Sequence, residues 1–107
     1  MSSLIKKNIT YIFLLGLTPS KAQRTALLQT ATKEQLKSLI ELAYNVLHLR
    51  IPITPYFQNK LKKKQVFLES LIDREKSQRQ KFNILKKNPA VIVILIKAAL
   101  PAISTLK

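Results

Sequence analysis

The fold depends most on residues 32–64, whose sequence is TKEQLKSLIELAYNVLHLRIPITPYFQNKLKKK. The first four residues form a capping box, in which the Thr32 hydroxyl and the Gln35 side chain each accept a hydrogen bond from a free amide at a helix N-terminus. The apolar residues behind the box recur at steps of three and four: they are Leu36, Leu39, Ile40, Ala43, Val46 and Leu47. This spacing predicts an amphipathic helix that ends near Arg50.

Two prolines separate this helix from the next one. Pro52 lacks an amide hydrogen and disfavours a helical conformation of Ile51, so it stops the first helix. Thr54 followed by Pro55 is typical of an N-cap with proline at the first helical position. One amphipathic helix is therefore expected from Thr54 to residue 72. Its apolar side contains Phe57, Leu61, Leu68, Leu71 and Ile72.

The N-terminal segment, residues 1–19, has two interpretations. Its lysines, its apolar run at residues 9–17 and the small residues of Ser20-Lys21-Ala22 are features of a signal peptide. The alternative is a first helix that packs on the rest of the chain, with Gly16 as its C-cap and Pro19 as its stop. We favour the helix, because a proline and a lysine fit a cleavage site poorly.

Two further capping boxes flank the middle of the chain. Ser20 to Gln23 opens a short helix, and Ser77 to Gln80 opens a short basic helix that ends at Asn88-Pro89. The polar stretch at residues 73–76 is expected to break the chain between helices. The hydroxyl groups in these boxes are interpreted as caps and not as nucleophiles, since the sequence places no base beside them.

The apolar tail at residues 90–106 fits several structures. A bilayer span needs about 20 apolar residues, and this stretch has Lys97 near its centre and Pro101 beyond it. A buried strand, a helix that fills a core, and an interfacial or lytic segment remain as alternatives. We expect a helix.

These patterns predict an all-α protein, a small bundle of four to five short helices with an apolar C-terminal segment. We divide the chain into an apolar N-terminal segment (1–19), a capped helical domain with a basic second half (20–87) and an apolar tail (88–107). A chain of 107 residues has a small core. An alternative to a monomer is therefore a homo-oligomer, in which a second copy of the chain completes the core.

The composition excludes most catalytic chemistry. There is no cysteine and one histidine, and the five acidic residues are scattered, so we predict no metal site, no cofactor and no enzyme activity. His48, near a helix C-terminus, is expected to complement the helix dipole. Tyr11, Tyr44 and Tyr56 are expected in the core or at its rim, although tyrosine also stacks on bases.

Positive charge is the strongest functional feature. The net charge is +14, which favours polyanionic partners, either nucleic acid or an anionic membrane. We predict non-specific contacts to DNA phosphates; the alternative is a solvated helix face. The predicted contact residues are Lys60, Lys62, Lys63, Lys64, Arg79, Lys81, Lys86 and Lys87.

The order of several motifs resembles a known viral family. These motifs are Arg24-Thr25-Ala26-Leu27-Leu28-Gln29-Thr30-Ala31, Asn45-Val46-Leu47, Ile51-Pro52-Ile53-Thr54-Pro55, the lysines that follow, and Ala98-Ala99-Leu100-Pro101-Ala102-Ile103. The pattern is similar to a short basic protein of Polinton/Maverick elements and adintovirus-like animal DNA viruses, which is compared with the adenovirus core protein X, or mu. Relatives carry a double glycine where this chain has Lys87-Asn88-Pro89-Ala90.

The resemblance implies a minor core or virion protein that helps to hold the packaged genome. Its partners would be DNA and viral capsid or core proteins. It would be located in the virion, and in the host nucleus or cytoplasm during assembly. Two alternatives remain open. One is a membrane-active or membrane-associated viral protein that uses its apolar segments. The other is a capsid cement protein that docks through its apolar ends.

Overall fold

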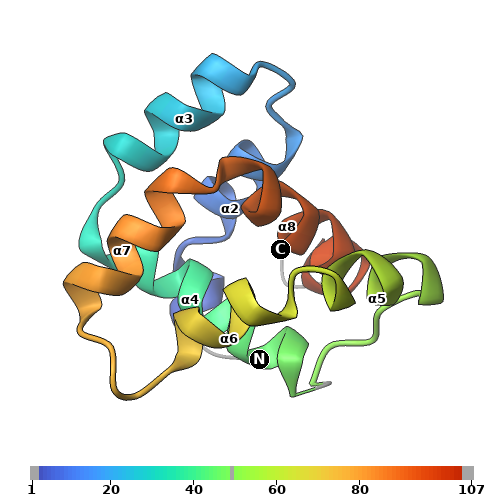
Figure 1. Cartoon of the computed structure of the whole chain (residues 1–107). Coiled ribbons are helices and arrows are strands. Elements are labelled where there is room, and N and C mark those ends of the chain that lie inside the picture. Colours follow the sequence, from blue (N-terminus) through green and yellow to red (C-terminus); the bar gives the residue numbers. More distant parts are fainter. Residues whose placement is uncertain (1–2, 49, 105–107) are drawn as a thin grey trace.

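The computed structural model describes residues 3–48 and 50–104, so residues 1–2 of the N-terminal segment and 105–107 of the tail lie outside the described part. Within these ranges the chain is helical and contains no strand (Figure 1), which confirms the all-α class. The eight helices of the described part are α1 (Ser3–Lys7), α2 (Ile9–Leu17), α3 (Lys21–Gln29), α4 (Lys33–Leu47), α5 (Pro55–Lys62), α6 (Gln65–Ile72), α7 (Gln78–Lys87) and α8 (Pro89–Ile103).

Helices α4 and α8 form the centre of the molecule. Helix α8 contacts α2, α3, α4, α5 and α7, and α4 contacts α1, α2, α6, α7 and α8. In Figure 1, α3 lies at the top of the view and α5 at the right, on either side of this centre. The principal extents are 30 × 30 × 26 Å and the radius of gyration is 12.5 Å, close to the roughly 13 Å expected of a folded domain of this length.

The apolar tail is a helix, as we expected, and it lies inside the core. Eight of its side chains are buried: Val91, Ile92, Val93, Leu95, Ile96, Ala98, Ala99 and Ile103. Pro101 lies within α8, where it cannot donate a hydrogen bond to the carbonyl of Lys97. Both residues are exposed, and the helix continues past the proline to Ile103.

The prediction that Gly16 caps the first helix is wrong. Helix α2 continues through Gly16 to Leu17, and Thr18 is its C-cap. Gly16 is buried, and a Cβ atom on it would lie 2.4 Å from Cγ2 of Ile96. The glycine is therefore needed for the close approach of α2 and α8 and not for the end of a helix.

Two of the three capping boxes form completely. In α4 the Thr32 hydroxyl accepts from the Gln35 amide at 3.1 Å and the Gln35 side chain accepts from the Thr32 amide at 2.9 Å. Ser77 and Gln80 make the same pair of bonds at the start of α7. At Ser20 only the first bond forms, from the amide of Gln23 at 3.3 Å, so the predicted box is half formed there.

The prediction of one continuous helix over residues 54–72 is also wrong. The chain turns at Lys63 and Lys64, where the amide of Lys64 donates to the carbonyl of Leu61 at 2.9 Å. The two halves pack on different partners, since α5 contacts α8 and α6 contacts α4. Leu61 of α5 and Leu68 of α6 are both buried, and the turn is one reason that the described helices outnumber the predicted four to five.

Candidate nucleic-acid interface

The predicted contact residues occupy two separate parts of the surface. Four belong to the junction of α5 and α6, which we call the lysine turn: Lys60, Lys62, Lys63 and Lys64. The other four lie on α7: Arg79, Lys81, Lys86 and Lys87. All four side chains of the lysine turn are exposed, as are those of Arg79 and Lys87, whereas Lys81 and Lys86 are half-buried.

Local sequence explains how α7 presents its cations. The box at Ser77 fixes the start of the helix, and Leu85 is buried while Phe82 packs partly against the core. The polar positions then point away from the core. No acidic residue occurs in α7, and none follows it, because all five acids of the chain lie between Glu34 and Glu75.

A cleft between α4 and α7 gathers two of these cations with a third that the sequence analysis missed. The cleft has a volume of about 480 Å³, and we call it the α4–α7 cleft. It is lined by Lys33, Gln78, Arg79, Phe82, Asn83 and Lys86. Three cations, two amides and one aromatic ring therefore share a hollow with no acidic side chain in its lining.

Lys81 lies in a different and less positive hollow. That hollow, of about 280 Å³, is lined by Lys81, Arg74, Glu41, Tyr44, Ile40 and Ile72. The carboxylate of Glu41 offsets part of its positive charge. Lys81 is thus separated from the three cations of the α4–α7 cleft.

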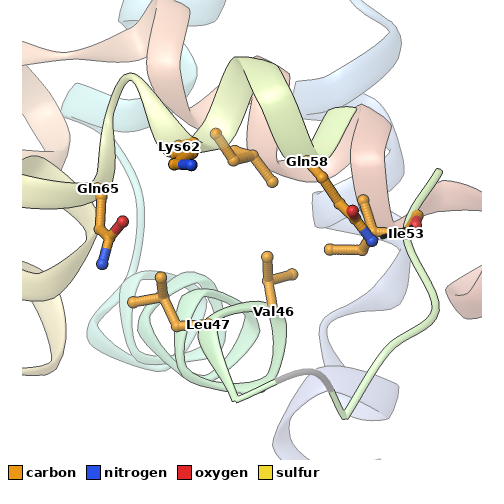
Figure 2. Close-up of a pocket in the computed structure, with 7 residues that line it drawn as sticks. Val46, Leu47, Ile53, Gln58, Lys62 and Gln65 are labelled. Carbon is orange, nitrogen blue, oxygen red and sulfur yellow. Dashed lines mark hydrogen bonds between the residues drawn. The ribbon is translucent and has the colours of Figure 1, made fainter. Parts of the chain in front are cut away.

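The hollow beside the lysine turn is mainly apolar. Figure 2 shows Val46 and Leu47 of α4 projecting toward α5, with Gln58 and Lys62 on the opposite side. The volume is about 270 Å³, and Ile53, Leu61 and Gln65 complete its lining. Lys62 is the one cation in this lining, so the lysine turn offers phosphates an open surface and not a cleft.

Cations in the described part are almost free of acidic partners. Its single ion pair joins Nζ of Lys37 to Oε1 of Glu34 at 3.8 Å. In the lysine turn, Nζ of Lys60 lies 4.7 Å from the centre of the Tyr56 ring, an arrangement that leaves the charge available to an anion. The positive surface is therefore not neutralised by the chain itself.

The tyrosines divide between core and rim. Tyr11 is buried, and its hydroxyl donates to the carbonyl of Leu27 at 3.2 Å. Burial raises the pKa of Tyr11 to about 12. Tyr56 is 54% exposed and stacks on Phe57 with 5.1 Å between ring centres, so it remains accessible to a ligand.

His48 occupies the position at which a histidine complements a helix dipole. It is the C-cap of α4, and its Nδ1 lies 2.9 Å from the carbonyl oxygen of Tyr44. Its ring stacks on that of Tyr44 at 4.2 Å, and the guanidinium of Arg50 lies 5.3 Å from the centre of the Tyr44 ring. These contacts give His48 a role in ending the helix.

Residues 3–48 and 50–104 contain neither a cluster of candidate metal ligands nor a membrane-spanning helix. No group of three or more His, Asp or Glu side chains in this part is placed to hold a metal ion. No helix in it is long and apolar enough to cross a membrane.

The missed cation, Lys33, has a recognisable sequence signal. It is the first residue of α4, and Arg79 is the second residue of α7. The helix dipole disfavours a cation at these positions. Lys33 thus lies directly after the capping residue Thr32, and Arg79 lies two residues after Ser77, where a bound anion would offset the unfavourable dipole.

Comparisons of the chain with models of protein families, with curated proteins and with solved structures gave no match. The fold and the surface just described are therefore the basis of the functional argument.

Proposed function

We propose that this chain is a small structural protein that binds DNA non-specifically through its phosphates, as a minor core protein of a virion does. The supporting observation is the surplus of accessible positive charge. The net charge is +14, and a single ion pair lies within the described residues. Such a surface binds the phosphate backbone by releasing counterions, without reading the bases.

The burial of the apolar segments favours this proposal over the membrane alternative. Helices α2 and α8 pack against each other, and Ile92, Leu95 and Ile96 of α8 are fully buried. Insertion into lipid would require these side chains to leave the core. Binding to DNA requires no such rearrangement.

The resemblance to the Polinton/Maverick and adintovirus-like protein supports a place in the virion, with DNA and capsid or core proteins as partners. A helical core with cations exposed on its surface supports this role. Capsid docking through the apolar ends is the remaining alternative. It predicts binding to capsids that is independent of the cations.

The test is the binding of the purified chain to two DNA duplexes of unrelated sequence over a range of salt concentrations. We expect equal affinities for the two duplexes and a linear fall of log affinity with log salt, with a slope of about 0.9 for each phosphate contacted. No binding to either duplex at low salt would refute the proposal. Anionic liposomes loaded with dye serve as the second arm, in which we expect no release.

A further inference from the structure

We propose that the α4–α7 cleft is the principal phosphate-binding site of the molecule. This inference rests on the proposed DNA binding and deepens it. It assigns the main contact to Lys33, Arg79 and Lys86, two of which belong to the predicted set and one of which does not.

The cations of the α4–α7 cleft converge from two helices. The lysine turn has four exposed cations but a mainly apolar hollow beside it, lined by one of them. The α4–α7 cleft has three cations from two helices in one hollow of about 480 Å³. Cations that surround an anion from several directions bind it more strongly than cations on one convex surface, because each phosphate oxygen then faces a positive partner.

Two of the three cations lie in the first turn of a helix, where the dipole is unfavourable for them. Lys33 is the first residue of α4, and Gln78 and Arg79 are the first two residues of α7, so side chains from the first turns of both helices line the cleft together with Lys86 from the last turn of α7. A helix N-terminus attracts anions and repels cations. Cations at these positions slightly lower the stability of the fold, because the helix dipole repels them. A bound phosphate offsets that repulsion.

Two amide side chains line the cleft together with the cations. Gln78 and Asn83 line the same cleft, and side-chain amides donate hydrogen bonds to phosphate oxygens. Glu34, the acidic residue nearest in sequence to Lys33, forms an ion pair with Lys37 and does not belong to the lining of the cleft. The cleft is therefore both positive and rich in donors.

The experiment compares three triple variants that lose the same charge. The cleft variant carries Lys33→Gln, Arg79→Gln and Lys86→Gln. The turn variant carries Lys60→Gln, Lys63→Gln and Lys64→Gln. The remote variant carries Lys6→Gln, Lys21→Gln and Lys97→Gln, which change exposed cations of α1, α3 and α8. Circular dichroism and thermal unfolding check the fold of each variant.

We expect the cleft variant to bind duplex DNA roughly ten- to a hundredfold more weakly at about 0.1 M salt, with the salt slope reduced by about 2 to 3. The turn and remote variants should each lose less. Removal of Lys33 and Arg79 should also raise the melting temperature of the free protein by a few degrees, because it relieves repulsion from the helix dipoles.

Equal losses in the three variants, or the largest loss in the turn variant, would overturn the assignment while the DNA binding of the wild type stands. A wild type that does not bind DNA would refute the proposed function itself. The two failures are thus distinguishable in one set of titrations.

Discussion

Gly16 determines how closely the first long helix can approach the last one. A Cβ atom at this position would lie 2.4 Å from Cγ2 and 3.2 Å from Cβ of Ile96, and both residues are buried. Interiors are packed closely enough that such an overlap forces side chains or backbone to shift. A glycine inside a helix normally costs up to about 1 kcal/mol relative to alanine. Here that cost is offset by the packing of α2 on α8.

We therefore predict that Gly16→Ala lowers the free energy of unfolding by roughly 1 to 3 kcal/mol, despite the better helix propensity of alanine. Urea unfolding measures the change. The matched control is Ile96→Leu, which moves the branch of the side chain away from the contact. In that background Gly16→Ala should cost much less. An equal cost in both backgrounds would show that the overlap is not the cause.

Tyr11 provides a prediction on pH. Folding raises its pKa from 10.0 to about 12 through burial, so the folded chain holds the phenolic proton more tightly than the unfolded chain. This contribution to stability is complete below pH 10 and is lost as the pH rises toward 12. The free energy of unfolding should therefore fall more steeply over this range in the wild type than in Tyr11→Phe. Identical slopes in urea unfolding would contradict this assignment.

For single helices, capping residues determine where a helix starts, whereas packing against other helices determines where residues 54–72 are divided. The boxes at Thr32 and Ser77 place the starts of α4 and α7 through neighbouring residues. In contrast, the break at Lys63 and Lys64 depends on tertiary packing, because α5 and α6 contact different helices. Periodicity alone predicts one continuous helix here, because the apolar residues of both halves would lie on the same face of it.

Helix α8 behaves as a core element and not as a detachable tail. We predict that Leu95→Asp, which places a carboxylate at a fully buried position, reduces or abolishes the folded state, because an unpaired buried charge costs several kcal/mol out of a total of about 5 to 15. Lys97→Asp changes an exposed residue of the same helix and should have little effect. Circular dichroism and thermal melting compare them; similar melting would mean that α8 is not packed as described.

At the scale of the whole molecule, apolar and charged residues are separated by the fold. The apolar ends of the chain, α2 and α8, meet inside, and the cations remain at the surface with one ion pair in the described part. A chain with this charge repels itself in free solution, and binding to a polyanion relieves that repulsion. The DNA titrations above test the proposal at this scale, because their salt slope reports the phosphates engaged by the whole surface.

The sequence by itself determined the all-α class, the starts of α4 and α7, and the excess of positive charge, since capping, periodicity and composition depend on neighbouring residues or on simple counts. Tertiary structure decided the rest. It placed Gly16 against Ile96, divided residues 54–72 between two packing partners, and brought Lys33 beside Arg79 and Lys86 in one cleft. These contacts join residues distant in the chain, and their geometry depends on how helices cross, which a local pattern does not encode.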